Sequence, residues 1–185
     1  MATKRAALIL AEGFEEIEAI SVVDVLRRAG VRVSMVGIER RDWVDGAHCI
    51  RLAAEGEVSD LSAEDLDLLV LPGGMPGARN LAGSGKVKQL LRETAARGAV
   101  IGAICAAPIA LAAAGLLEGR RVTCYPGFEK ELSGGVYTGA RVEVDGNIVT
   151  GCGPGGALVF ALALLESIGL QREAGHLAEG MLIKA

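Results

Sequence analysis

The sequence predicts an α/β sandwich, in which helices cover both faces of a mainly parallel β-sheet. Two observations lead to this prediction: short apolar runs alternate with helical patterns, and glycines stand where several of the runs end. Continuous apolar runs are typical of strands buried on both faces, and their alternation with helices favours parallel connections. The 185 residues suit a single domain over residues 1–185, without internal repeats or linkers.

The predicted strands are short apolar runs bounded by turn residues. In chain order they cover residues 6–10, 31–36, 66–71, 99–104, 121–124, 141–144 and 147–150. Asp145-Gly146 joins the last two and is a hairpin signal, so this pair is expected to be antiparallel. Residues 43–54 show no clear period and are expected to be irregular or to form a hairpin.

The predicted helices cover residues 15–29, 86–97, 108–114, 155–168 and 173–182. The first has acidic residues in its first turn and Arg27-Arg28 in its last, an arrangement that the helix dipole favours. Gly30 follows it at the position where a C-terminal glycine belongs. Pro108 opens the third helix, at a position that tolerates proline.

Composition disfavours several classes of function. The formal net charge of −4, the absence of a long basic cluster and an aromatic content of 3% argue against a nucleic-acid-binding surface. Residues 98–117 and 148–165 are uncharged and long enough to span a membrane, but glycine and proline interrupt both runs. Residues 1–5 lead directly into a strand, so we expect no secretory signal and a cytoplasmic location.

The cysteines do not form a recognisable framework. They are four, at positions 49, 105, 124 and 152. Their wide spacing, without a C-x-x-C pair, predicts free thiols rather than disulfides. Only two histidines occur, His48 and His176, and neither lies at a predicted strand end. A zinc site and a Cys-His dyad are therefore not expected, and no metal or cofactor is predicted.

In such folds ligands bind at the carboxyl ends of the strands, which here are followed by residues 12–13, 73–74, 105–106 and 151–156. Cys105 is the chemically reactive residue among them. Small residues flank it at Ala103 and Ala107, as the sharp turn of a nucleophile elbow requires. The start of a helix nearby would lower the pKa of its thiol, although a buried structural cysteine fits the same pattern.

Two further features point to the same edge of the sheet. Gly73-Gly74 follows a strand and leaves backbone N–H groups unobstructed, which suits either an oxyanion hole or a simple tight turn. Glu18 shares an apolar helical stripe with Val22 and Val25, so its carboxyl is either buried and protonated or at the surface. Burial would raise its pKa and let it donate a hydrogen bond to the Cys105 sulfur. Glu15 is expected in the solvated first turn.

Residues 151–156 match the dinucleotide-binding pattern G-x-G-x-x-G. That site also needs a following strand that ends in an acidic residue, and the remaining residues have a helical pattern. Nucleotide binding is therefore not predicted, and this loop is expected to close the pocket beside Cys105.

Taken together, these segments resemble the ThiJ/PfpI superfamily, and within it the branch that contains the Parkinson disease protein deglycase and the bacterial ThiJ/YajL-type proteins. The matching stretches are Lys4–Ala29 with Glu-Glu-Ile-Glu at 15–18, Leu69–Gly74, Ala103–Pro108 and Gly153–Gly155. The resemblance implies a flavodoxin-like three-layer sandwich and a homodimer. It assigns the reactive cysteine to Cys105, its carboxyl partner to Glu18, and the oxyanion donors to the backbones of Gly74 and Ala106.

The resemblance also implies cofactor-independent chemistry on small reactive carbonyls, such as methylglyoxal, or on their early glycation adducts. The alternative is an oxidative-stress sensor or redox-regulated chaperone that acts through oxidation of Cys105 without turnover. This chain has Ala106 and Tyr125 where superfamily members carry histidines, which argues against peptidase activity. Ile17 and Ile20 lie away from the Glu18 stripe, so the first helix is expected in the dimer interface.

Overall fold

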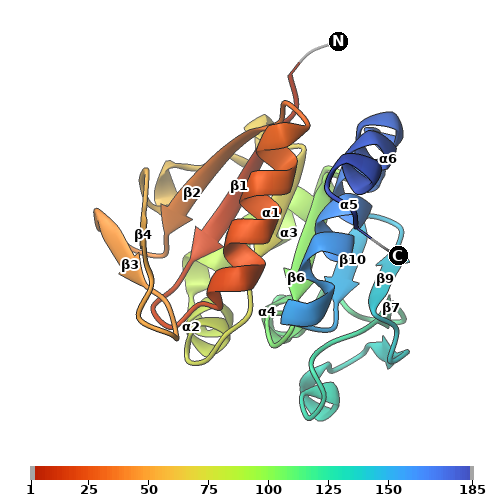
Figure 1. Cartoon of the computed structure of the whole chain (residues 1–185). Helices are drawn as coiled ribbons and strands as arrows, with labels where there is room; N and C mark the ends of the chain where they lie inside the picture. The colour runs from red at the N-terminus through yellow and green to blue at the C-terminus, as the bar shows by residue number, and fades with distance from the viewer. Residues whose placement is uncertain (1–2, 184–185) are drawn as a thin grey trace.

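The computed structural model describes residues 3–183 (Figure 1). Residues 1–2 and 184–185 lie outside this range. They are the two ends of the predicted domain 1–185, and residues 1–2 also belong to the segment 1–5 on which the expectation of no secretory signal rests. A six-stranded sheet forms the middle layer, with strand order β2-β1-β5-β6-β10-β9. Its strands are β1 (Arg5–Leu10), β2 (Arg32–Gly37), β5 (Leu68–Leu71), β6 (Val100–Ile104), β9 (Val142–Asp145) and β10 (Ile148–Gly151). All neighbouring pairs are parallel except β9 with β10.

Helices cover both faces of this sheet. They are α1 (Glu16–Arg28), α2 (Gly77–Gly83), α3 (Gly85–Ala96), α4 (Pro108–Ala113), α5 (Ala157–Ser167) and α6 (Gln171–Gly180). The helices α1, α5 and α6 pack side by side on the face toward the viewer, and α2, α3 and α4 lie behind it (Figure 1). The structure thus confirms the predicted sandwich with its mainly parallel sheet and antiparallel edge pair.

Two buried clusters hold the layers together, one on each face of the sheet. Alternate residues of the same strand enter different clusters: Ile9 packs toward α2 and α3, whereas Leu8 and Leu10 pack toward α1 and α5. This is the alternation that a pleated strand imposes. Because both faces are covered, every residue of β5 and β6 is buried, which explains the continuous apolar runs in the sequence.

Residues 43–54 form a hairpin, one of the two expected alternatives, from the antiparallel strands β3 (Trp43–Asp45) and β4 (Arg51–Ala53). Three differences from the sequence prediction stand out. The strand predicted at 121–124 is only β7 (Arg121–Val122), which leaves the main sheet and pairs with β8 (Val136–Tyr137). The helix α2 was not predicted, since it is short and has glycine at both ends. Short 3₁₀ turns occur at Val58–Asp60, Ala63–Asp65, Glu129–Glu131 and Pro154–Gly156.

Within residues 3–183, no helix has both the length and the apolar character needed to cross a bilayer. The two long uncharged runs of the sequence are instead strand-turn-helix units, β6 with α4 and β10 with α5.

Candidate active site

Cys105 lies in a sharp turn between β6 and α4. Its backbone has φ = +63°, a left-handed conformation that residues other than glycine seldom adopt. Hydrogen bonds hold the residue on both sides: its N–H donates to the Gly151 carbonyl at 2.8 Å, and its own carbonyl accepts from the Tyr125 N–H at 2.9 Å. The predicted elbow is therefore present, and its strained backbone is fixed by two neighbouring segments.

The carboxyl group of Glu18 lies against the Cys105 thiol. Glu18 projects from α1 into the interior and is fully buried, so of the two positions that the apolar stripe allowed the structure shows the buried one. Its Oε2 accepts a hydrogen bond from the Gly73 N–H at 2.7 Å. Its Oε1 is buried without a hydrogen-bond partner among the described residues. Oε2 and the Cβ of Cys105 both lie within 2.8 Å of the point where a Cβ of Gly73 would stand, so the carboxyl group is next to the Cys105 side chain and each group shifts the pKa of the other. The structure thus brings together the two side chains that the sequence singled out.

Gly73 permits this close approach. A Cβ atom at this position would lie 2.6 Å from the Cβ of Cys105 and 2.8 Å from Oε2 of Glu18, closer than side-chain atoms tolerate. Only glycine therefore allows the end of β5, the elbow and the carboxyl group to meet. The sequence identified the Gly73-Gly74 pair, but the resemblance assigned a role only to the backbone of Gly74.

The backbone N–H groups of Gly74 and Ala106 lie near the Cys105 thiol, where both act to lower its pKa. Gly74 has φ = +87°, and the left-handed conformation turns its amide into the site. Two amides converging on one atom form a concave anion-binding arrangement. They are the two donors that the family resemblance assigned to an oxyanion hole.

The ionisation of this pair differs from the sequence prediction. Burial raises the pKa of the Glu18 carboxyl to about 7, and the Gly73 N–H and the Cys105 thiol offset this only in part. Burial, followed by the Glu18 charge, raises the pKa of the Cys105 thiol to about 12. The expected lowering by a helix dipole was wrong, because α4 has only six residues and desolvation outweighs the two amides. At neutral pH the proton therefore resides on sulfur whenever Glu18 is charged.

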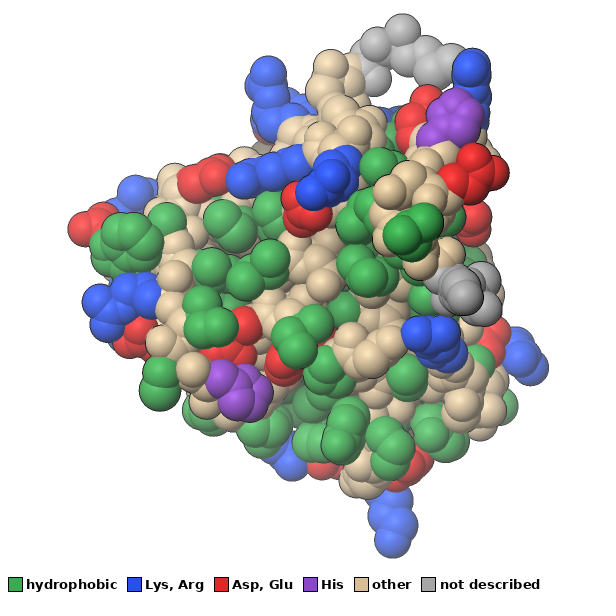
Figure 2. Space-filling model, viewed as in Figure 1, with side chains coloured by type: hydrophobic (Ala, Val, Ile, Leu, Met, Phe, Trp, Pro, Cys, Tyr) green, Lys and Arg blue, Asp and Glu red, His purple; other side chains and the backbone are tan. Residues whose placement is uncertain are grey.

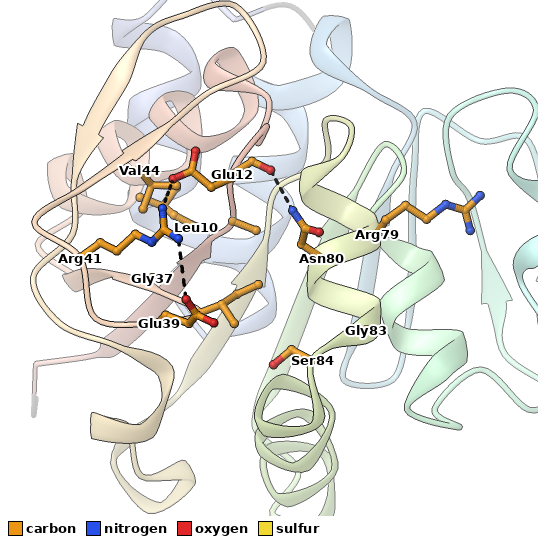
Figure 3. A pocket seen from close by; sticks show the side chains of 12 residues that line it. Leu10, Glu12, Gly37, Glu39, Arg41, Val44, Arg79, Asn80, Gly83 and Ser84 are labelled. Carbon is orange, nitrogen blue, oxygen red and sulfur yellow. Dashed lines mark hydrogen bonds and ion pairs between the residues drawn. The ribbon is translucent and has the colours of Figure 1, made fainter.

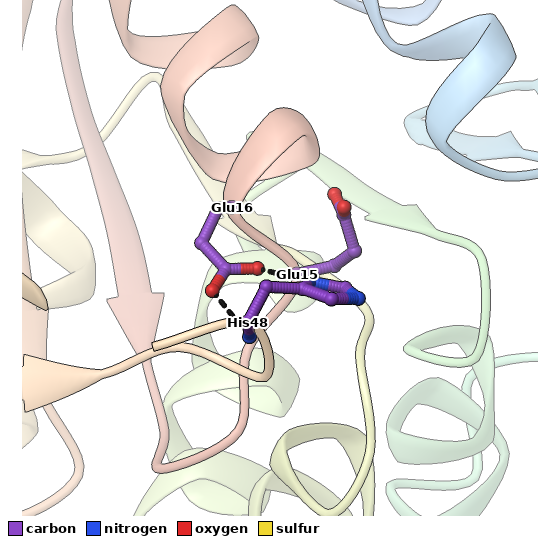
Figure 4. Close-up of side chains that lie close together, drawn as sticks. All are labelled: Glu15, Glu16 and His48. Atoms are coloured by element: carbon purple, nitrogen blue, oxygen red, sulfur yellow. Dashed lines mark hydrogen bonds and ion pairs between the residues drawn. The ribbon is translucent and has the colours of Figure 1, made fainter. Parts of the chain in front are cut away.

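Glu15, Glu16 and His48 form a second polar cluster beside the site (Figure 4). Glu16 is buried, and its carboxylate accepts from the His48 backbone N–H at 2.6 Å and lies 2.8 Å from His48 Nδ1. Glu15 is also buried, contrary to the expected solvated position, and its Oε2 caps α1 by accepting from the Glu18 N–H. Potential ligand atoms of the three residues lie within 4.8 Å of one another, a spacing compatible with a metal ion.

Sequence reasoning missed this cluster, because His48 comes from the hairpin and approaches α1 only in the folded chain. The Glu-Glu motif at the start of the helix is visible in the sequence, but the hydrogen-bond partners of the two carboxylates are not.

A separate cavity of about 460 Å³ opens beyond the carboxyl ends of β1 and β2 (Figure 3). Its floor includes Leu10 and Val44, and Arg41 crosses it to pair with Glu12 at 2.9 Å and Glu39 at 3.8 Å. Cys105 and Glu18 do not line this cavity. Glu18 is instead fully buried, and Cys105 keeps only 8% of its surface accessible.

The four cysteines are free thiols, as predicted. Cys124 is fully buried, and burial raises the pKa of its thiol to about 11. Cys49 is exposed in the hairpin and Cys152 is half-buried. Only Cys105 combines a carboxyl partner with converging amides. The arrangement suits a nucleophile that gives its proton to a neighbouring carboxylate while backbone amides stabilise negative charge.

Comparison with known proteins identifies the family to which this chain belongs. Residues 4–167 match the model of the DJ-1/PfpI family. The chain is 40% identical over 172 residues to "Parkinson disease protein 7 homolog" of Danio rerio, with 91% of each chain covered. It is 37% identical over 172 residues to "Glutathione-independent glyoxalase DJR-1.2" of Caenorhabditis elegans, again with 91% of each covered. The crystal structure of Drosophila melanogaster DJ-1beta superposes with a TM-score of 0.95 at 35% identity, over the full length of both chains. The resemblance noted in the sequence is confirmed, and the chain belongs to the DJ-1/PfpI family.

Proposed function

We propose that this protein is a cofactor-independent, cysteine-dependent enzyme that acts on reactive 2-oxoaldehydes, converting methylglyoxal to lactate, or on their early glycation adducts. The observation that carries the proposal is the buried Glu18 carboxyl next to the Cys105 side chain, where both meet Gly73, with the Gly74 and Ala106 amides near the thiol. A relative of similar length is named a glutathione-independent glyoxalase, which supports the same chemistry.

The first step forms a carbon–sulfur bond. Glu18 removes the thiol proton as the Cys105 sulfur attacks the aldehyde carbon, and the developing oxyanion accepts hydrogen bonds from the Gly74 and Ala106 amides. Protonation of that oxygen gives a hemithioacetal. Because the thiol is buried and has a raised pKa, the neighbouring carboxylate is the group that makes attack feasible near neutral pH.

The second stage moves a proton between adjacent carbons. Glu18 removes the hydrogen from the former aldehyde carbon and returns it to the neighbouring carbonyl carbon, which converts the hemithioacetal into a thioester of a 2-hydroxy acid. Water then attacks the thioester, releasing the hydroxy acid and restoring the thiol. The sequence is redox-neutral overall: the aldehyde carbon is oxidised and the adjacent carbon is reduced. A carboxyl group with a pKa of about 7 suits both proton removal and proton return.

The decisive experiment follows lactate formation from methylglyoxal in wild type and Cys105→Ala. We expect Cys105→Ala to abolish turnover, whereas Cys49→Ala, which removes the exposed thiol of the hairpin, keeps wild-type rates. Undiminished turnover in Cys105→Ala would eliminate the proposed mechanism. The same assay with a methylglyoxal-modified thiol or amine distinguishes glyoxalase from deglycase activity.

The alternative function is an oxidative-stress sensor in which Cys105 is oxidised without turnover. The raised pKa of Glu18 favours it, because a protonated carboxyl group can donate a hydrogen bond to a sulfinate. Mass spectrometry after mild peroxide treatment tests this function. A selective gain of two oxygens on Cys105, together with no carbonyl turnover, would favour the sensor over the enzyme.

We also propose that the protein is a homodimer that associates through α1 and acts in the cytoplasm. Ile17 and Ile20 on α1 are 56% and 43% exposed, and Leu158 on the adjacent α5 is 38% exposed. Figure 2 shows hydrophobic side chains gathered over this face. Exposed apolar patches of this kind mark interaction surfaces. Four free thiols suit a reducing compartment.

A further inference from the structure

Tyr125 lies beside the elbow and takes no part in the steps described above. Its N–H donates to the Cys105 carbonyl oxygen at 2.9 Å, so its backbone is fixed directly against the reactive residue. Pro126 follows it and restricts its backbone further. The residue nevertheless remains 47% exposed. An aromatic ring that is held by its backbone but open to solvent is a suitable contact surface for an apolar group.

The ring rests on the loop that follows β10. A Cβ atom at Gly153 would lie 3.0 Å from Cδ2 of Tyr125, so the ring packs against bare backbone at this glycine. The strand β10 pairs with β6, and its Gly151 carbonyl accepts the Cys105 N–H, so the loop starts directly beside the elbow. The elbow that carries the thiol is therefore hydrogen-bonded through its backbone both to Gly151 at the start of this loop and to Tyr125, whose ring packs on Gly153.

We infer that Tyr125 is a specificity-determining residue that favours 2-oxoaldehydes with an aromatic or other apolar substituent, an inference that rests on the proposed function. All 2-oxoaldehydes present the same aldehyde carbon to the sulfur and the same oxygen to the amides. They differ in the substituent on the second carbonyl. Phenylglyoxal carries a ring that can pack against Tyr125, whereas the hydrogen of glyoxal offers no such contact.

The test compares kcat/KM for phenylglyoxal and glyoxal in wild type, Tyr125→Ala, Tyr125→Phe and Tyr137→Ala. We expect Tyr125→Ala to lower the phenylglyoxal-to-glyoxal ratio roughly three- to tenfold, because the aromatic contact is lost. Tyr125→Phe keeps the ring and the ratio. Tyr137→Ala is the matched control, since it removes another partly exposed tyrosine that is not stacked on Gly153. An unchanged ratio in Tyr125→Ala, or an equal loss in Tyr125→Phe, would overturn the inference.

A second measurement does not require turnover. The rate of Cys105 alkylation by N-phenylmaleimide is compared with that by N-methylmaleimide, using mass spectrometry of the Cys105 peptide. The phenyl-to-methyl ratio should fall in Tyr125→Ala by a similar factor and stay constant in Tyr137→Ala. If wild type shows no turnover but the alkylation ratio falls in Tyr125→Ala, the proposed function is rejected and the aromatic contact is supported. Normal turnover with both ratios unchanged would reject the role of Tyr125 alone.

Discussion

Glu18 is a carboxyl group that the fold buries completely, and its ionisation opposes folding. Its folded-state pKa of about 7 lies above the ordinary value of 4.5, so the folded chain binds the proton more tightly than the unfolded chain. The free energy of unfolding therefore falls as pH rises from about 4.5 to about 7. Above pH 7 the ionisation of Glu18 lowers the free energy of unfolding by roughly 3 kcal/mol.

Glu18→Gln should remove this pH dependence, because the amide keeps the shape but cannot ionise. We expect Glu18→Gln to be more stable than wild type at pH 8 and to lose that advantage at pH 4. Urea unfolding at the two pH values measures the difference. Because Glu18→Gln keeps all other titrating groups, the comparison is the difference in free energy of unfolding between the variant and wild type. The same difference at pH 4 and pH 8 would contradict the raised pKa of Glu18. The same variant should lose most of its methylglyoxal turnover.

Gly73 offers a steric test of the site. Gly73→Ala places a methyl group within 2.6 Å of the Cys105 Cβ and 2.9 Å of the Ile104 carbonyl oxygen, so β5 and the elbow must separate. We expect a destabilisation of about 1–3 kcal/mol together with a loss of Cys105 reactivity. Gly83→Ala, at the end of α2, is the control, since a Cβ there meets no atom within 4 Å. Equal thermal stability and equal alkylation rates in both variants would show that the contact is not restrictive.

The proposed catalytic pair could be singled out from sequence because each signal is local. A cysteine between small residues at a strand end favours an elbow, and a glutamate on an apolar helical stripe is either buried or at the surface, a choice that only the folded chain makes. The direction of the Cys105 pKa shift could not be predicted, since it depends on how deeply the turn is buried and on the Glu18 charge. The requirement for glycine at position 73 likewise depends on three segments that meet only in the folded chain.

At the scale of elements, the buried carboxylate of Glu16 joins the β3–β4 hairpin to α1, while backbone hydrogen bonds to Gly13 and Phe14 join it to the loop before the helix. Glu16 accepts from the backbone N–H of His48 at 2.6 Å and from that of Ile50 at 3.4 Å, and the hairpin contributes no strand to the main sheet. Burial opposes ionisation of Glu16, but hydrogen bonds from His48 outweigh it and lower the pKa of this carboxyl. The same contact raises the pKa of His48.

Glu16→Ala should therefore loosen the hairpin around His48 and Ile50 without unfolding the sheet. The variant leaves the hairpin amides without their acceptor, a loss of roughly 1–3 kcal/mol in local stability. Hydrogen exchange should become faster across residues 43–53 and remain slow in β1 and β5. His48→Ala keeps the carboxylate and its backbone hydrogen bonds, so its effect should be smaller. Unchanged exchange in the hairpin of Glu16→Ala would show that other contacts hold it.

Most elements of the main sheet could be placed from their apolar runs, because burial on both faces produces a strong local signal. The elements that were missed or misjudged are peripheral. The helix α2 is too short for a helical period to appear, and β7 and β8 are two residues each and pair with each other outside the main sheet. The position of the hairpin against α1 depends on a contact between Glu16 and His48, which are 32 residues apart.

At the scale of the whole molecule, the apolar face of α1 and α5 is the proposed interface between the two copies of the homodimer. A cavity of about 300 Å³ lies on this face and is lined by residues that include Ile17, Leu158 and Arg141. In the single chain, Ile17 and Ile20 leave apolar surface in water that a second copy would bury. The face is separate from the sheet edge at β9, so association there would not extend the sheet.

Light scattering of wild type at micromolar concentration should give about twice the chain mass of 19.0 kDa. Ile17→Asp combined with Ile20→Asp should give the monomer mass, because burying two carboxylates in an apolar interface is costly. Val144→Asp, at an equally exposed position on the edge strand β9, should remain dimeric and controls for surface charge. Because α1 also carries Glu18, the monomeric variant tests whether association supports the site. A Cys105 alkylation rate equal to that of wild type would mean that each chain forms its site without the second copy. A wild-type monomer would contradict the proposed dimer, and a dimeric double variant would place the interface on another face.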